Sequence, residues 1–312
     1  MSGEHSKKSG EHGEKLAEAF LKAIGWHQDL KALTIPCTDG NHVGSGGNPR
    51  KTHGDDRVFI YNNPFYESRT DIIHVSVKNN IGGYSEKESE LRTTLKNFVL
   101  EANEIIACAR YDTTIHEVAT AFPSRRRLEH SGLLIWTSSH NESFDRDVLS
   151  ACAPARGLDD ACTYNVYLVD GARINFILTA LDHADREQGA TYRFFFPDTG
   201  LVNKGDERHG KFLPLELVVA DMLPLKVDTL DSERLHLYVR QPFDEEAYTR
   251  AIALALSLTG GWGRAVRIGF PDYNASQHDH LAAKAKLPFD NRETDISAFC
   301  YIRSNLNALE TI

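Results

Sequence analysis

The residues whose types could do chemistry are concentrated in the first quarter of the chain. One group lies in the apolar segment Ile72–Lys78 (IIHVSVK), which predicts a strand. Successive side chains of a strand point to opposite faces, so His74, Ser76 and Lys78 share one face. A lysine on so apolar a strand needs a charged partner, because burying an unpaired ammonium group is costly.

A candidate partner precedes the strand predicted at Arg57–Tyr61 (RVFIY). Asp55 and Asp56 stand at the entry to that strand. If the two strands form a hairpin, an acid from this entry lies beside the C-terminal end of the second strand, next to Lys78. A carboxylate there can hold a divalent metal, and a lysine can polarise a phosphate or orient a water.

A further acid, Glu14, begins a predicted helix. The segment GEHGEKLAEAFLKAIGW carries apolar residues at helical spacing and ends at Gly25-Trp26. The apolar residues are Leu16, Ala17, Phe20, Leu21 and Ile24.

Together these motifs resemble the PD-(D/E)XK nuclease superfamily. Asp56 opens the first hairpin strand, and Ser76-Val77-Lys78 stands where the family has (D/E)-x-K, 20 residues after Asp56. In some branches a metal-site glutamate lies in a first helix reading G-x-x-x-E…G-aromatic, which Glu14 and Gly25-Trp26 match. The resemblance implies an α/β fold, with an N-terminal restriction-endonuclease-like αβββαβ core followed by a second α/β domain.

The same resemblance implies a divalent-metal-dependent endonuclease acting on DNA with Mg²⁺ or Mn²⁺. Asp56 would bind the metal, with Glu14 and the carbonyl of Val77 as further ligands. Lys78 would position the attacking water and stabilise charge on the phosphate. Ser76 would hydrogen-bond a water of the metal.

The main departure from the family pattern is Ser76, which replaces the second acid. Serine is a poor metal ligand, and this favours an alternative: a non-cleaving nucleic-acid sensor or assembly subunit that retains a degraded nuclease fold. Asp71 competes for the role of Asp56. It lies five residues from Ser76 and seven from Lys78, however, and a regular strand therefore turns it to the other face.

Each proposed site residue also has an ordinary structural explanation. Glu14 fits a solvated first-turn glutamate, Asp56 a turn residue and Lys78 an exposed strand-end lysine. Their combined order and spacing favour the nuclease core.

Basic residues near these motifs are candidates for contacts with DNA phosphates. Arg50, Lys51 and Arg57 flank a glycine-rich segment, 38–55, that predicts a loop. A second group, Arg125, Arg126 and Arg127, fits either a backbone-tracking surface or a charged linker.

The overall charge limits how the chain meets DNA. There are 35 Lys and Arg against 44 Asp and Glu, a formal net charge of −9. This argues against coating nucleic acid through bulk charge. We therefore expect a second protein subunit or a homo-oligomer to supply part of the DNA-binding surface. The resemblance to the nuclease superfamily implies the nuclease subunit of a bacterial restriction or phage-defence system. The apolar runs are too short for a membrane span, and the polar N-terminus is no secretory signal, so a cytoplasmic protein without a membrane partner is expected.

The cysteine and histidine spacing argues against other sites. The five cysteines form no CxxC pair, so neither a disulfide framework nor a structural zinc site is expected. His278 and His280 lack a third zinc ligand. His53 and His74 lie near the proposed site and fit proton transfer as well as structural hydrogen bonding.

Composition places a soft domain boundary near residue 125. Residues 1–125 would form the nuclease-like domain, and residues 126–312 an α/β domain that recognises substrate or a partner. Strands are expected at 132–136, 164–169, 174–178, 192–196 and 234–239, and helices at 86–110, 215–222 and 244–258. The aromatic residues of the second half fit a core, a base-stacking platform or a subunit interface.

Overall fold

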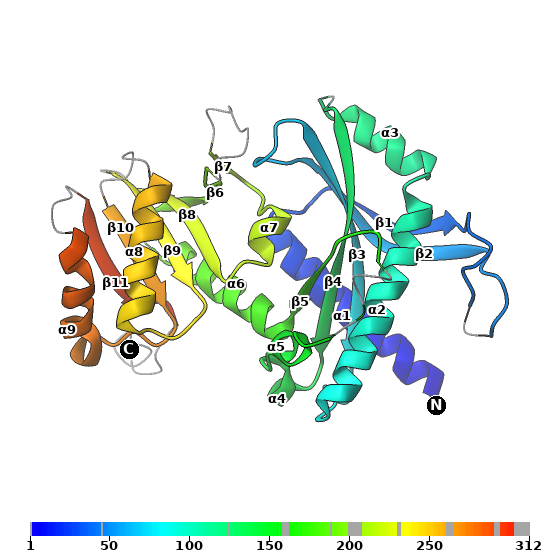
Figure 1. Ribbon diagram of the computed structural model, residues 1–312, viewed down its shortest axis with the longest axis horizontal. Coiled ribbons are helices and arrows are strands. Elements are labelled where there is room, and N and C mark those ends of the chain that lie inside the picture. The colour runs from blue at the N-terminus through cyan, green and yellow to red at the C-terminus, as the bar shows by residue number, and fades with distance from the viewer. Residues whose placement is uncertain are drawn as a thin grey trace. The chain divides into compact units, whose positions relative to one another are not determined.

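The structure is a computed structural model that describes residues 2–44, 46–123, 125–155, 157, 162–187, 189–198, 208–229, 232–259, 265–289 and 294–302, without the side chains of residues 2–9, 141 and 142 (Figure 1). The chain divides into two compact units, Met1–Asn175 and Phe176–Ile312. Among the described helices, none is long and apolar enough to cross a bilayer.

The first unit is built on a five-stranded mixed sheet. Its strands are β1 (Asp29–Pro36), β2 (Thr52–Asn62), β3 (Arg69–Asn80), β4 (Arg127–Ser138) and β5 (Val166–Asp170). They lie side by side in this order; β1, β2 and β3 are antiparallel, and β3, β4 and β5 are parallel. The predicted hairpin is therefore β2–β3.

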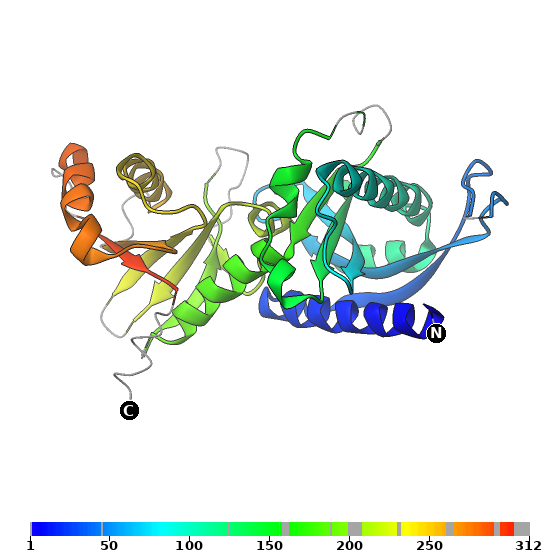
Figure 2. The same ribbon diagram turned by 90° about the horizontal axis from the view of Figure 1, so that it is seen from below.

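Helices cover both faces of this sheet. They are α1 (Ser2–Ala23), α2 (Glu88–Ala109), α3 (Thr113–Ala121), α4 (Asn141–Phe144) and α5 (Val148–Cys152). Figure 2 shows α1 along one face and α2 along the other. The parallel strands β3 and β4 require a long crossover, which α2 and α3 provide. Leu91, Leu95 and Val99 of α2 pack in one core cluster with Leu134 and Trp136 of β4.

The predicted α/β fold with an αβββαβ core is confirmed. The element order is α1, β1, β2, β3, α2, α3 and β4, which adds only the short α3 to the expected core. Sequence patterning found α1, although the helix starts at Ser2 and not near Glu14. It gave no separate signal for β1, an edge strand whose exposed residues interrupt the apolar alternation.

The boundary expected near residue 125 is wrong for the division into compact units. Strand β4 pairs with β3 along its whole length, from Arg69 opposite Arg127 to Asn80 opposite Ser138. Strand β5 then pairs with β4. A cut at residue 125 would divide one sheet, and the first unit instead extends to Asn175.

The second unit is a six-stranded mixed sheet in the order β11-β10-β9-β8-β6-β7. Its strands are β6 (Thr191–Phe195), β7 (His209–Gly210), β8 (Met222–Asp228), β9 (Glu233–Val239), β10 (Ala265–Phe270) and β11 (Asp295–Cys300). Strands β9, β10 and β11 are parallel and are linked through α8 (Glu245–Thr259) and α9 (Ala275–Lys286). A 3₁₀ turn, η1 (Leu287–Phe289), follows α9. Asp244 caps α8, since its Oδ1 accepts a hydrogen bond from the Ala247 N–H at 2.7 Å.

Two elements near the second unit differ from the sequence prediction. The strand expected at 174–178 lies inside α6 (Gly171–Asp185), whose buried Ile174, Ile177 and Leu181 follow a helical period. A short apolar run does not distinguish a strand from a buried helix. The helix expected at 215–222 is only α7 (Leu215–Val218), because β8 begins at Met222.

Candidate functional site

The predicted site lies where β2 and β3 stop pairing. The ladder runs from Asn62 opposite Thr70 to Arg57 opposite Val75, and Asp56 is the next residue of β2. Beyond this point a side chain takes the place of the backbone acceptor: Asp56 Oδ2 accepts a hydrogen bond from the Val77 N–H at 2.8 Å. The acid is thereby held against the S-V-K segment by the backbone of its middle residue.

A local irregularity of β1 and β2 aims Asp56 into this position. The β1–β2 pairs Lys31–Arg57 and Leu33–Asp55 leave Ala32 and Asp56 between them, and Ala32 has a positive φ of 50°. Asp55 and Arg57 would share a face in a regular strand. Instead, Asp55 contacts His74 on the α2 side, whereas Arg57 contacts Glu18 of α1. The strand therefore changes face at Asp56, as at a β-bulge.

Lys78 lies on the face of β3 that packs against α2. Its Nζ is 2.8 Å from Glu101 Oε2 and 5.3 Å from the centre of the Phe98 ring. The period of two places Ser76 on the same face. Glu101 is the charged partner that Lys78 requires, and sequence reasoning missed it. Nothing in the sequence distinguishes it from Glu88, Glu90 and Glu104 of the same helix.

Glu14 lies where α1 approaches β3 very closely. A Cβ atom added to Gly13 would lie 2.6 Å from Cβ of Asn79, so only glycine fits there. Glu14 is the next residue and is exposed. Its charge is the smallest of the contributions that raise the pKa of Asp56, and its role as a metal ligand stays a prediction.

The electrostatics of Asp56 favour the arrival of a cation. Asp56 is exposed at the surface, but the protein atoms packed around its carboxyl group desolvate it and raise its pKa above the ordinary value, and the charges of Asp55 and Glu14 raise the pKa further. The Val77 N–H and the charge of Lys78 act in the opposite direction without reversing this rise. A carboxylate whose charge is poorly compensated by the protein is suited to a positively charged ligand.

A pocket of about 570 Å³ opens beside these residues. It is lined by Gly10, Val77, Lys78 and Phe98, together with the segment 79–83 that follows β3. This pocket is large enough for a phosphodiester group, and Lys78 is the cationic side chain in its wall. Asp56, which is bonded to the Val77 backbone, and the pocket lined by Val77 and Lys78 therefore both lie at the C-terminal end of β3.

The three basic residues predicted to contact DNA, Arg50, Lys51 and Arg57, differ in their exposure. Lys51 is exposed and Arg50 is half-buried, with its Nε donating to the Val43 carbonyl at 3.3 Å. The placement of Arg57 does not favour the predicted DNA contact. Its guanidinium is buried and forms ion pairs with Asp29 at 2.7 Å and Glu18 at 3.4 Å.

Arg125, Arg126 and Arg127 lie at the other end of β3. In the β3–β4 ladder, Arg127 lies opposite Arg69. Arg69 is nine residues before Lys78, which corresponds to about 30 Å along a strand. Arg125 donates to the Tyr66 carbonyl at 2.7 Å, and Arg127 pairs with Glu129 at 2.6 Å. This placement puts the three arginines far from Lys78, and their predicted contact with a DNA backbone stays a prediction.

Other polar residues of the sheet are engaged in structural contacts. Asp71 lies near the start of β3, where Arg69 Nε is 2.6 Å from its Oδ1. His74 bonds through Nδ1 to Asp55 at 2.6 Å and through Nε2 to His130 at 3.0 Å. Burial, followed by the charges of His74 and Arg110, lowers the pKa of His130 to about 3. These histidines form an interior chain and do not line the pocket beside Lys78.

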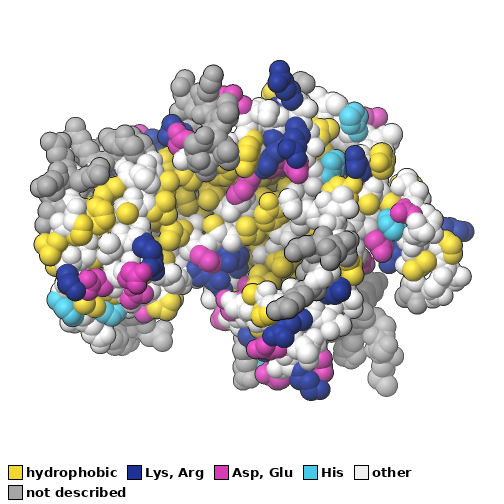
Figure 3. All heavy atoms as spheres, viewed as in Figure 1, with side chains coloured by type: hydrophobic (Ala, Val, Ile, Leu, Met, Phe, Trp, Pro, Cys, Tyr) yellow, Lys and Arg dark blue, Asp and Glu magenta, His cyan; other side chains and the backbone are white. Residues whose placement is uncertain are grey.

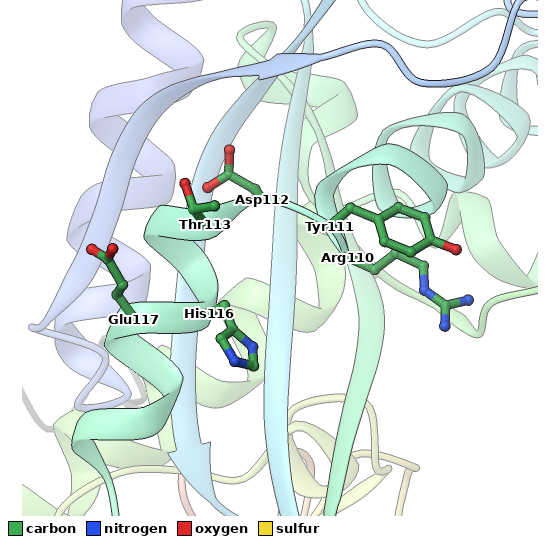
Figure 4. Close-up of a pocket in the computed structure, with 6 residues that line it drawn as sticks. All are labelled: Arg110, Tyr111, Asp112, Thr113, His116 and Glu117. Atoms are coloured by element: carbon green, nitrogen blue, oxygen red, sulfur yellow. The ribbon is translucent and has the colours of Figure 1, made fainter.

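A second cavity, of about 300 Å³, lies at the turn between α2 and α3 (Figure 4). It is lined by Arg110, Tyr111, Asp112, Thr113, His116 and Glu117. Figure 4 shows that these side chains point in different directions and do not converge. Asp112 caps α3 by accepting hydrogen bonds from the Thr114 and Ile115 N–H groups. None of the predicted site residues lines this cavity.

Four side chains from distant parts of the first unit also meet. The potential ligand atoms of Cys37, His42, His53 and Cys108 all lie within 4.8 Å of one another. The sequence argued against a zinc site because it has no CxxC pair, and the geometry overturns that argument. His53 belongs to this group, and not to the pocket beside Lys78.

Comparison with known proteins agrees with the geometry. Residues 1–173 match a family described as the GAPS4 protein PD-(D/E)XK nuclease domain. The match covers more than half of the 312 residues and ends two residues before the end of the first unit. No curated protein matches the chain.

Proposed function

The chain belongs to the GAPS4 PD-(D/E)XK nuclease domain family, and from this premise we propose that it is a divalent-metal-dependent endonuclease that hydrolyses DNA. The observation that carries the proposal is the position of Asp56. Its carboxylate replaces the next rung of the β2–β3 ladder and lies beside the pocket that contains Lys78.

The donor set at this position fits a hard cation such as Mg²⁺ or Mn²⁺. Asp56 and Glu14 offer carboxylate oxygens, and Val77 offers a carbonyl oxygen; these are the ligand types that such ions prefer. The raised pKa of Asp56 is a further sign of an incompletely compensated acid. When bound, the cation would supply positive charge that stabilises the negative charge developing on the phosphate.

Glu101 compensates for the missing acid of the S-V-K segment. Ser76 is neutral and offers a hydroxyl group that can hydrogen-bond a water. Glu101 brings a carboxylate from α2 to the same face, where it holds Lys78 at 2.8 Å. We therefore assign the second negative charge of this site to α2 instead of β3.

Lys78 has two tasks in this scheme. Its ammonium group can donate three hydrogen bonds, and one of them goes to Glu101 Oε2 at 2.8 Å. The remaining donors orient the attacking water and stabilise the phosphate oxygens in the transition state. Glu101 positions Lys78 for both tasks.

Exposed basic residues near the site are few, which supports a role for a partner. Lys51 immediately precedes β2 and is five residues before Asp56, about 17 Å in an extended chain, or roughly five base-pair steps. Figure 3 shows Lys and Arg side chains interspersed with Asp and Glu on the face viewed. With a net charge of −9, the chain would bind DNA weakly alone. We propose that a second protein or a second copy completes the DNA surface, that the second unit recognises substrate or partner, and that the assembly acts in the cytoplasm in phage defence.

A non-cleaving nucleic-acid sensor is the second candidate, and Ser76 is the observation that favours it. A nicking assay separates the two candidates. The full chain, with and without the product of an adjacent gene, is incubated with supercoiled plasmid and Mg²⁺ or Mn²⁺. We expect nicking that disappears in Asp56→Ala and Lys78→Ala but persists in the matched exposed-residue control Glu11→Gln.

Two results would count against the proposed site. Undiminished nicking by Asp56→Ala would overturn the assignment of residues. No nicking under any of these conditions, combined with saturable DNA binding, would establish the sensor.

A further inference from the structure

The geometry points to a second metal site that is independent of the proposed nuclease site. We propose that Cys37, His42, His53 and Cys108 bind one structural Zn²⁺ ion in a tetrahedral Cys₂His₂ arrangement. The site joins three segments of the first unit: Cys37 and His42 in the connection after β1, His53 at the start of β2, and Cys108 near the end of α2.

Four of the six separations between the ligand atoms are close to the edges of a zinc tetrahedron, and the two between His53 and the sulfur atoms are within 4.8 Å. The two Sγ atoms are 4.0 Å apart, and His42 Nδ1 is 3.6 Å from Cys37 Sγ and 3.5 Å from Cys108 Sγ. His42 Nδ1 is 3.2 Å from His53 Nε2. Zn–S bonds of about 2.3 Å and Zn–N bonds of about 2.05 Å give tetrahedral edges of roughly 3.8, 3.5 and 3.3 Å for S–S, S–N and N–N. All four separations agree within a few tenths of an ångström.

Hydrogen bonding alone does not explain this group. His42 Nδ1 lies within 3.6 Å of two sulfur atoms and one ring nitrogen, but a single ring nitrogen carries at most one proton. A disulfide does not explain it either, because 4.0 Å is about twice the length of an S–S bond. One cation at the centre satisfies all four atoms simultaneously.

Neighbouring groups complete the site as they do around known structural metals. The Thr38 backbone N–H donates to Cys108 Sγ at 3.4 Å, and Thr38 Oγ1 does so at 3.5 Å. The Asp39 carboxylate lies 3.8 Å from His42 Nε2, the nitrogen that faces away from the centre. Such contacts stabilise a thiolate and fix the orientation of a histidine ligand.

Four protein ligands and their burial indicate a structural ion. His53 and Cys108 are buried, and Cys37 and His42 are half-buried. A catalytic zinc keeps one position open for water, whereas a site closed by four side chains does not. The softer sulfur and nitrogen donors also select zinc over magnesium.

The segment held by this ion buries few apolar side chains, although backbone hydrogen bonds cross it, such as that from the Arg50 N–H to the His42 carbonyl at 2.7 Å. It runs over residues 38–51, is rich in glycine, and leaves Val43 half exposed. Figure 2 shows the connection between β1 and β2 projecting away from the sheet. Since so little apolar surface is buried there, metal binding would supply the free energy that offsets the ordering of this chain segment. The ion would thereby also fix the backbone that carries Arg50 and Lys51.

Metal analysis of the purified full chain tests this inference. We expect about one zinc per chain that survives dialysis against a weak chelator, and Co²⁺ replacement should give the visible absorption of a tetrahedral cobalt thiolate site. Cys108→Ser and His53→Ala should lose the metal, whereas Cys152→Ser, which changes another buried cysteine, should retain it. Cys37→Ser provides a second thiolate variant if one fails to fold.

Two results would overturn the inference. One is a chain that is free of metal and gives no tetrahedral spectrum after reconstitution with Zn²⁺ or Co²⁺. The other is zinc that remains at full stoichiometry in folded Cys37→Ser and Cys108→Ser, which would place the ion elsewhere.

Discussion

His53 and Asp56 are three residues apart on β2, and they differ in their burial and in the kind of donor atoms around them. His53 is buried and belongs to a closed group of sulfur and nitrogen donors from three segments. Asp56 lies at the edge of a pocket, near oxygen donors on α1 and β3 and near a lysine. The closed group suits an ion that holds the fold together. The open one suits an ion that meets a substrate.

This difference shows how one short strand can serve both stability and chemistry. The strand changes face at Asp56, and this change separates the two metal-binding environments. Before Asp56, the side chains of His53 and Asp55 point toward the α2 side of the sheet. The backbone that positions Asp56 is therefore fixed on one side by the Cys/His group and on the other by the β2–β3 ladder.

The largest expected effect is on stability, when one of the four side chains of the Cys/His group (Cys37, His42, His53 and Cys108) is replaced. Cys108→Ser should lower the thermal midpoint of the first unit by more than about 10 °C, because structural zinc contributes several kcal/mol to folding. Calorimetry measures this shift, and Cys152→Ser is the control. An equal loss in both variants would assign the effect to core packing instead of metal.

The next effect is on chemistry, at Lys78. Lys78→Ala should reduce plasmid cleavage by roughly 100- to 1,000-fold, because it removes a charge that is aimed at the transition state. Binding of Mn²⁺ should remain. The control is Lys96→Ala on α2, and near-normal cleavage by Lys78→Ala would remove that residue from the site.

A smaller loss is expected at Glu101, which acts on Lys78. Glu101→Gln should lower cleavage about tenfold and shift the acidic or basic limb of the rate–pH profile, as expected for a group that positions a charge. Glu104→Gln, three residues along the same helix, should cleave normally. Identical rates and pH profiles for the two variants would show that Glu101 has no special role.

The smallest effect concerns pH and Asp56. Its folded pKa is raised, so its contribution to stability is present below the unfolded pKa and is lost as pH rises through the folded pKa. At neutral pH without added Mg²⁺, Asp56→Asn should therefore melt slightly higher than the native chain, by on the order of 1 °C. The difference should vanish in acid, near the pKa of an ordinary aspartate. A lower midpoint for the variant at neutral pH would contradict the raised pKa.

The sequence predicted the local arrangement of the candidate site residues. Asp56, Ser76 and Lys78 lie in adjacent strands of one hairpin, and a period of two fixes which side chains share a face. The first helix was predicted from its apolar stripe and its defined end, and Glu14 lies on it. The αβββαβ order was implied by the family resemblance that these motifs carry.

The remaining features depend on contacts between distant segments. Glu101 differs from the other glutamates of α2 only because its turn of the helix faces Lys78. The Cys/His group has ligands at positions 37, 42, 53 and 108, a spacing that no short motif describes. The sequence predicted a DNA contact for Arg57, but in the fold its guanidinium forms ion pairs with Asp29 and Glu18. Likewise, the boundary near residue 125 failed because β4 completes the sheet begun by β3.

The most direct test of two separate metal sites is a Mn²⁺ titration of the zinc-loaded full chain, followed by electron paramagnetic resonance. We predict that the native chain binds Mn²⁺ while keeping its zinc, and that Asp56→Asn keeps the zinc but loses most of its Mn²⁺ affinity. Equal Mn²⁺ binding by the two proteins, or release of zinc as Mn²⁺ binds, would contradict this account.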